Sequence, residues 1–230
     1  MNIQEYEALE KERINRNLKY MEEGVVFIDL KMAYIDEGVR IGRGTTIYPC
    51  AVIEGDVTIG ENCIIGQNTR IKDSVIGDNT TVQSSVILES RVGSDTSVGP
   101  FAYLRPNSNV GSGCKVGDFV EIKNSTLADG AKASHLTYIG DSDVGERVNL
   151  GCGVVFVNYD GSKKYRSVVE DGAFIGCNSN LVSPVHIGKN AYVAAGSTIT
   201  NDVPEGALYV ARARGKSLEG WVEKRGILKK

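Results

Sequence analysis

Aliphatic residues recur every six positions along most of this chain, and this spacing limits the folds that it can adopt. Three runs keep the step without a miss. They are Ile41, Ile47, Ile53, Ile59, Ile65 and Ile71; Val92, Val98, Leu104, Val110, Val116 and Ile122; and Val169, Ile175, Leu181, Ile187, Val193 and Ile199. A helix would need apolar residues about 3.6 apart, and a hairpin sheet would alternate with a period of two. The six-residue step predicts a solenoid in which each hexad supplies one short strand with one inward aliphatic residue.

Glycine is abundant, with 27 residues in a chain of 230, and much of this excess follows the repeat. A glycine comes directly after many of the repeating aliphatics, as in Ile59-Gly60 and Ile175-Gly176. We expect these glycines to adopt the turn conformations that end each strand. Three hexads make a triangular coil of about 18 residues, so the stretch from Ile41 to Ile199 predicts roughly nine coils, stacked about 4.8 Å apart by parallel ladders.

The repeat is interrupted in two ways. Five-residue steps, at Ile71–Ile76, Ile122–Leu127 and Ile139–Val144, fit as adjustments at corners. The step from Phe156 to Val169 is larger, and its polar and aromatic segment VNYDGSKKYRSV predicts a loop that leaves the solenoid wall. Such a loop is either a functional site or a tolerated surface insertion.

The ends of the chain depart from the repeat, so we expect three parts. Residues 1–24 form a helical arm, with a helix over about 3–23 that carries Ile14, Leu18 and Met21 on one stripe. Residues 25–210 form the solenoid domain. Residues 211–230 form a tail with Arg212, Arg214 and Lys216 close together, either as solvated charge or as an anion clasp.

Composition and charge exclude several functional classes. A net charge of −3 supplies no overall basic field that would favour nucleic acid. No apolar run approaches the roughly 18 residues of a membrane span. The charged N-terminus lacks the apolar core of a secretory signal, so we expect a cytoplasmic protein. The five cysteines are widely spaced without any CxxC pair, which predicts neither a disulfide framework nor a zinc site.

Longer strings within the repeats carry a more specific pattern. They are RPNSNVGSGCKVGDFVEIKNS, SHLTYIGDSDVGERVNLGCG, VNYDG, FIGCNSNLVSPV and YVAAGSTIT. In this order and spacing, from about Glu7 to Trp221, they resemble the C-terminal acetyltransferase domain of the bifunctional N-acetylglucosamine-1-phosphate uridyltransferase/glucosamine-1-phosphate acetyltransferase family. That family opens with a nucleotide-binding domain and a Gly-rich phosphate loop, and no such segment precedes the helix here, so uridyl transfer is not expected from these residues.

The resemblance implies an all-β solenoid, a left-handed parallel β-helix of hexapeptide repeats with a short N-terminal helix. It also implies a homotrimer with active sites between subunits. Three subunits are compatible with the flat faces of a prism.

Acetyl transfer from a thioester to an amine needs a base, donors for the developing oxyanion, and positioning of both substrates. His135 matches the family's catalytic histidine, and histidine is a natural base at neutral pH because its unperturbed pKa is about 6.5. It lies two places after the core position Ala133, so its side chain should point outward. Glu121 precedes Tyr138 by about one coil, and we expect its carboxylate to orient His135.

The resemblance assigns the remaining site residues. The cations Arg105, Lys123 and Lys164 match positions that hold the sugar phosphate, and converging cations suit a dianion. Tyr138 and Asn149 match positions that contact the sugar. The positions matched for acetyl-CoA are Cys152, Asn158, Tyr159, Cys177, Ala195 and Arg212. Asn158 is expected to polarise the thioester carbonyl and Arg212 to meet a CoA phosphate, and no metal is expected.

The leading prediction is an acetyltransferase that makes N-acetylglucosamine-1-phosphate, a precursor in the UDP-GlcNAc and cell-wall pathway. Val154, Val155 and Phe156 stand where the family carries Thr-rich residues, so another amino sugar or sugar nucleotide is an alternative acceptor. A second alternative is a non-catalytic scaffold whose helical arm docks a separate nucleotidyltransferase. A carbonic anhydrase built on the same repeat would need three histidine ligands, and this chain has only His135 and His186.

Overall fold

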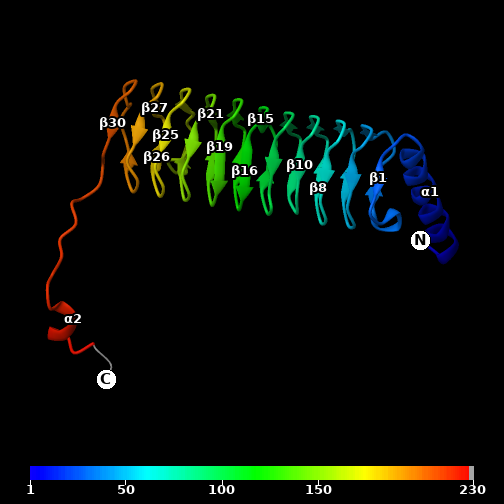
Figure 1. The fold of residues 1–230 in the computed structure, drawn as a ribbon, viewed down its shortest axis with the longest axis horizontal. Coiled ribbons are helices and arrows are strands. Elements are labelled where there is room, and N and C mark those ends of the chain that lie inside the picture. The colour runs from blue at the N-terminus through cyan, green and yellow to red at the C-terminus, as the bar shows by residue number, and fades with distance from the viewer. Residues whose placement is uncertain (228–230) are drawn as a thin grey trace.

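The computed structural model describes residues 1–227 and consists of a long parallel β-solenoid with a helix at its N-terminal end (Figure 1). Its architecture is a left-handed parallel β-helix, as predicted. The solenoid has three parallel sheets, A, B and C, and each strand pairs with the strand one coil before and after it. Among residues 1–227, no helix is both long enough and apolar enough to cross a membrane.

Sheet A is one face of the prism. Its strands are β1 (Val26–Phe27), β4 (Thr46–Ile47), β7 (Ile64–Ile65), β10 (Thr81–Val82), β13 (Ser97–Val98), β16 (Lys115–Asp118), β19 (Lys132–His135), β22 (Asn149–Leu150), β25 (Phe174–Ile175), β28 (Tyr192–Val193) and β30 (Leu208–Tyr209). Sheet B follows it in each coil. Its strands are β2 (Tyr34–Ile35), β5 (Val52–Glu54), β8 (Arg70–Lys72), β11 (Val86–Leu88), β14 (Tyr103–Leu104), β17 (Glu121–Lys123), β20 (Tyr138–Gly140), β23 (Val155–Val157), β26 (Asn180–Val182) and β29 (Thr198–Ile199).

Sheet C closes the triangle. Its strands are β3 (Arg40–Ile41), β6 (Thr58–Ile59), β9 (Val75–Ile76), β12 (Arg91–Val92), β15 (Asn109–Val110), β18 (Thr126–Leu127), β21 (Ser142–Val144), β24 (Ser167–Val169) and β27 (His186–Ile187). These nine strands agree with the number of coils predicted from the spacing, and sheets A and B extend further at the ends.

The predicted aliphatic column is the core of the solenoid. Of the eighteen hexad residues, Ile41 at the N-terminal end is partly buried and the other seventeen are at most 2% exposed. A second inward position lies two residues before each aliphatic and holds a small side chain. Examples are Ala51, Cys63, Thr69, Thr96, Ala102 and Cys114. Where this residue has a hydroxyl, it bonds the backbone: Thr96 Oγ1 donates to the carbonyl of Gly111 (2.9 Å) and accepts from the amide of Cys114 (3.1 Å).

The glycine that follows an aliphatic has a different role from the one predicted. A Cβ added at Gly93 would lie 2.6 Å from the backbone of Gly111 in the next coil, so close approach between coils excludes a side chain there. The left-handed turn residues come later in each corner and are mostly Asn, Asp or Gly. Each predicted five-residue step is a corner with one such residue: Asp73, Asn124 and Asp141.

Helix α1 (Ile3–Glu22) covers the N-terminal end of the solenoid (Figure 1). The apolar stripe of Ile14, Leu18 and Met21 is not the face that packs, because Leu18 and Met21 are exposed. Polar side chains pack instead, since the first coil presents carbonyls that need donors. Tyr20 OH donates to the carbonyl of Val39 (2.6 Å), and Asn17 Nδ2 donates to that of Leu30 (2.9 Å).

Among the described residues, no helix covers the opposite end of the solenoid. Beyond β30 the chain extends away from the solenoid and ends in a short helix, α2 (Trp221–Lys224) (Figure 1). The last three residues of the predicted tail, 228–230, lie outside the described residues.

Candidate active site

His135 contacts a carboxylate of the preceding coil. It ends β19 in register with Asp118, which ends β16, and His135 Nδ1 lies 2.5 Å from Asp118 Oδ1. The His135 side chain is 54% exposed, so it points outward as predicted. The hydrogen bond with His135 lowers the pKa of the Asp118 carboxyl.

Contrary to the expectation, Glu121 makes no hydrogen bond with His135 among residues 1–227. Glu121 is in register with Tyr138, as its spacing predicted, but this register places it on the outer face of sheet B. There its Oε1 accepts a hydrogen bond from Arg105 Nη1 (2.8 Å). Asp118 occupies the corner before sheet B, which is the corner of His135, and so it makes the contact that Glu121 was expected to make.

A second group of polar residues lies at the other edge of sheet B. Asp141 is almost fully buried there and accepts hydrogen bonds from Asn124 Nδ2 (2.6 Å) and Asn158 Nδ2. Lys123 Nζ lies 3.6 Å from Asp141 Oδ2. Burial raises the pKa of the Asp141 carboxyl, but the two amides and the charges of Lys123 and Lys164 outweigh burial, so its pKa lies below the ordinary value.

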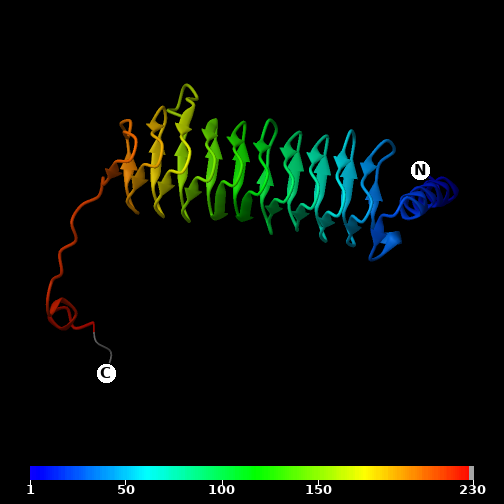
Figure 2. The ribbon, with the colours of Figure 1, turned by 45° about the horizontal axis from the view of Figure 1, so that its top comes forward.

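The predicted loop is present and delivers Lys164 to this group. We call residues 158–166 the excursion loop, which projects from the wall in Figure 2. Tyr159 and Lys164 pair across it as an antiparallel bridge. Arg166 anchors its end with a hydrogen bond from Nε to Asp143 Oδ2 (2.6 Å) and one from Nη1 to the carbonyl of Asn124 (3.0 Å).

Four of the residues predicted to bind acetyl-CoA follow His135 along one corner of the solenoid. The core positions of successive strands in sheet A are register partners, and the residues two places after them align in the same way. In coil order these residues are His135, Cys152, Cys177 and Ala195. Arg212 extends this corner column, because a Cβ added at Gly196 would lie 3.8 Å from Arg212 Cδ. Four coil spacings of about 4.8 Å give the column a length of roughly 19 Å.

The structure separates other predicted residues from this column. Asn158 binds Asp141 and lies 3.5 Å from the hydroxyl of Tyr138, at the Lys123 edge of sheet B. Tyr159 is exposed on the excursion loop and donates to the carbonyl of Gly161 (2.6 Å). Asn149 lies on sheet A, in register with Lys132 and Phe174.

Several polar residues of the site were missed by the sequence analysis. They are Asp118, Asn124, Asp141 and Arg166. The available signal was spacing: Asp118 precedes His135, and Asn124 precedes Asp141, by the same 17 residues that separate register partners in this part of the solenoid. Other carboxylates also lie 17 residues before a residue of the next coil. Spacing alone therefore does not show which carboxylate contacts which partner.

The departure from the family pattern before the excursion loop affects one outward-facing position. Val154 and Phe156 are buried in the core. Val155 is half-buried and in register with Tyr138, so it is the member of this trio that lies on the outer face of sheet B.

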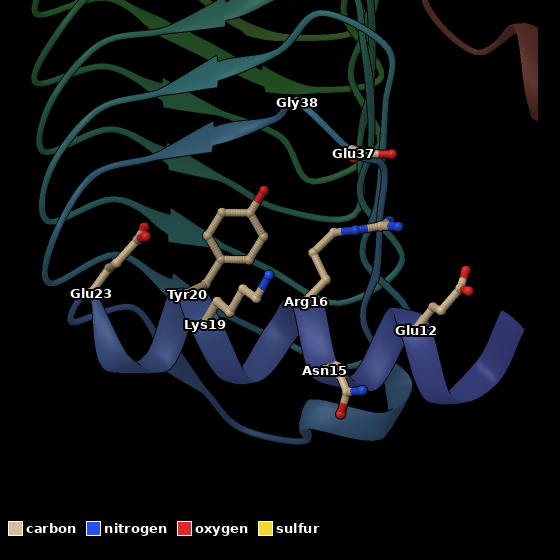
Figure 3. A pocket seen from close by; sticks show the side chains of 8 residues that line it. All are labelled: Glu12, Asn15, Arg16, Lys19, Tyr20, Glu23, Glu37 and Gly38. Atoms are coloured by element: carbon tan, nitrogen blue, oxygen red, sulfur yellow. The ribbon is translucent and has the colours of Figure 1, made fainter. Parts of the chain in front are cut away.

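A separate cavity of about 490 Å³ lies between α1 and the first coils, and Figure 3 shows its lining. The lining residues are Glu12, Asn15, Arg16, Lys19, Tyr20, Glu23, Glu37 and Gly38. None of them belongs to the His135 corner or to the Lys123 edge. Within residues 1–227, no three His, Cys, Asp or Glu side chains are grouped so as to hold a metal ion.

Two family models match parts of the chain. The bacterial transferase hexapeptide model (six repeats) matches residues 166–201, and the GMPPB C-terminal domain model matches residues 33–108. The bifunctional protein GlmU of Clostridium botulinum (strain Langeland) is 54% identical over 230 residues, which are 100% of this chain and 50% of that protein. GlmU of Clostridium beijerinckii is 54% identical over 229 residues with the same coverage. The solved Arabidopsis UDP-N-acetylglucosamine acyltransferase is 17% identical with a TM-score of 0.45, covering 89% of this chain and 76% of that chain.

The repeats, the solenoid and the matching repeat model define a protein of the bacterial hexapeptide-transferase class. Within this class, the chain matches the C-terminal half of the bifunctional protein GlmU over its full length. It spans about half the length of the curated relatives that it matches.

Proposed function

We propose that this chain transfers the acetyl group of acetyl-CoA to the amine of glucosamine-1-phosphate, with His135 as the general base. The observation that carries the proposal is that His135 lies at the corner before sheet B, while the cations Lys123 and Lys164 lie at the far edge of that sheet. A sugar lying across Tyr138 would direct its phosphate to the cations and its amine to the imidazole. The GlmU relatives support this choice of substrates.

The reaction balances with His135 as the only proton acceptor. The amine nitrogen attacks the thioester carbonyl, and the imidazole takes a proton from the nitrogen. Collapse of the tetrahedral intermediate breaks the C–S bond, and the CoA sulfur leaves with the electron pair. The proton held by the imidazole can then protonate the thiolate, which restores the base.

The acetyl-CoA site proposed here is the corner column from His135 to Arg212. A column of roughly 19 Å along the coils suits the length of an extended pantetheine arm, with the thioester beside His135 and the CoA phosphates near Arg212. In this arrangement Cys152 and Cys177 contribute wall contacts rather than a nucleophile. Because Asn158 Nδ2 donates a hydrogen bond to Asp141, we place Asn158 on the sugar side of the site rather than beside the thioester carbonyl.

We also propose a homotrimer. His135 is half-exposed and Lys164 lies on an exposed loop, so one subunit leaves the reacting groups open to water. Acyl transfer to an amine rather than to water needs a site from which bulk water is excluded. A neighbouring subunit packed against this corner would close the site.

The test is thiol release from acetyl-CoA with glucosamine-1-phosphate as acceptor. His135→Ala should abolish release, and His186→Ala is the matched control because His186 is also exposed and paired with a carboxylate, Glu170. Unchanged turnover in His135→Ala would exclude this base. If the folded wild-type protein releases no thiol, another amino-sugar acceptor or a non-catalytic scaffold would be favoured. Assays with glucosamine, glucosamine-6-phosphate and amino-sugar nucleotides would distinguish these two alternatives.

A further inference from the structure

We propose that Asp118 is the positioning residue for His135: its carboxylate holds the proton on Nδ1 and so leaves Nε2 as the basic nitrogen. This inference rests on the proposed function, in which His135 is the base. Three observations carry it: the contact, the local strand geometry and the charge of the pair.

The contact is direct. His135 Nδ1 lies 2.5 Å from Asp118 Oδ1. A neutral imidazole has one nitrogen that donates and one that accepts, whereas a carboxylate only accepts. The nitrogen that faces Asp118 must therefore carry the hydrogen. The tautomer that results presents the lone pair of Nε2 away from Asp118, toward solvent or substrate.

The backbone is built to keep the two side chains aligned. Strands β16 and β19 are four residues long, whereas every other strand among residues 1–227 has two or three. Both extend two residues past the core position, to Asp118 and His135. The amide of Leu136 also donates to the carbonyl of Asp118 (2.9 Å), so the ladder continues through the pair into the corner.

The charge of the pair suits the reaction. The hydrogen bond with His135 lowers the pKa of Asp118, so its carboxylate is ionised at neutral pH. That negative charge stabilises the imidazolium formed when Nε2 takes a proton from the amine. The other titratable groups on the neighbouring strands and coil are Lys115, which also lowers the pKa of Asp118, Lys132 and the thiol of Cys152.

The chain contains a matched control. His186 Nε2 lies 2.9 Å from Glu170 Oε1 on sheet C, and this pair is also about half-exposed. It lies outside the corner column. Removing its carboxylate tests whether any loss of an exposed histidine–carboxylate pair changes the enzyme.

The experiment compares Asp118→Asn, Asp118→Glu and Glu170→Gln by the pH dependence of kcat/KM for the amino sugar. In Asp118→Asn we expect kcat to fall about 10- to 100-fold. We also expect the acid limb of kcat/KM to move to lower pH, because an imidazole without its carboxylate gains a proton less readily. Asp118→Glu should keep the position of the limb and part of kcat, and Glu170→Gln should match the wild type. An Asp118→Asn profile identical to the wild type would overturn the proposal.

A second measurement does not depend on turnover. Nitrogen-15 spectra of the wild-type imidazole at high pH should show His135 protonated at Nδ1, and finding the hydrogen on Nε2 would overturn the proposal even if Asp118→Asn does not fold. This readout also separates the two proposals. If the wild type does not acetylate glucosamine-1-phosphate, the proposed function fails, while the tautomer still tests the role of Asp118.

Discussion

Lys164 of the excursion loop lies beside Lys123 of β17, so two ammonium groups meet at the edge of sheet B. The side-chain hydrogen bond with Lys123 and the charge of Lys123 lower the pKa of Lys164. Asp141 contacts Lys123, but its carboxylate is already shared with two amides. Two cations held together with one buried carboxylate form a site with excess positive charge, which an anionic ligand would balance.

Lys164→Met should raise KM for the sugar phosphate about 10- to 100-fold and change kcat less. One charge-assisted hydrogen bond contributes roughly 1.5–3 kcal/mol, which corresponds to that range. The check is steady-state kinetics together with inhibition by inorganic phosphate, which should weaken in parallel. Lys163→Met in the same loop is the control, and an equal effect there would mean that only the net charge of the loop matters.

Arg166→Ala should free the excursion loop without unfolding the solenoid. The Arg166 guanidinium bonds Asp143 and the carbonyl of Asn124, which ties the loop to two earlier coils. We expect faster amide exchange at residues 159–165, a higher KM for the sugar phosphate, and a nearly unchanged Tm. Arg147→Ala removes an exposed arginine pair with Glu146 and serves as the control. Unchanged exchange in the loop would show that Arg166 is not its anchor.

Asp141 should make stability depend on pH in the acid range. Its pKa in the folded protein is lower than its ordinary value, so its ionised form favours folding. This contribution is complete above the unfolded pKa of about 3.9 and is lost as pH falls through the lower folded value. Urea unfolding midpoints measured between pH 3 and 7 should show that Asp141→Asn is less stable than the wild type at neutral pH. Below about pH 4 the midpoint of this variant should change less with pH than that of the wild type. Asp56→Asn, which removes a carboxylate from an exposed ion pair, is the control and should keep the wild-type dependence of stability on pH. If Asp141→Asn also keeps the wild-type dependence, this assignment is wrong.

Gly117→Ala should separate the coils that carry Asp118 and His135. A Cβ at Gly117 would lie 1.9 Å from the carbonyl oxygen of Ser134, so β16 and β19 would have to move apart. We expect activity to fall more than stability. Gly113→Ala is the matched control, because its Cβ would meet nothing within 4 Å and the cost of its left-handed backbone is about 1 kcal/mol. Equal activity losses in the two variants would argue against a specific role for this close approach.

The fold was predictable because its main determinant is periodic. Burial of Ile53, Leu104 and Leu181 follows from the six-residue step, since each coil repeats the same inward position. The excursion loop after Phe156 was predictable for the same reason, as the repeat stops there and resumes at Val169. The polar packing face of α1 was not, because it depends on carbonyls of the first coil that no local pattern of the helix encodes.

The sequence by itself determined the coil, the three sheets and the outward position of His135, because the hydrophobic period sets which residues face the core. The tertiary structure alone decided that Asp118 rather than Glu121 meets His135, and that Lys164 meets Lys123. Those contacts join residues of different coils or of a loop outside the repeat. They depend on which corner a side chain occupies and on the path of the chain between coils, and hydrophobic spacing constrains neither.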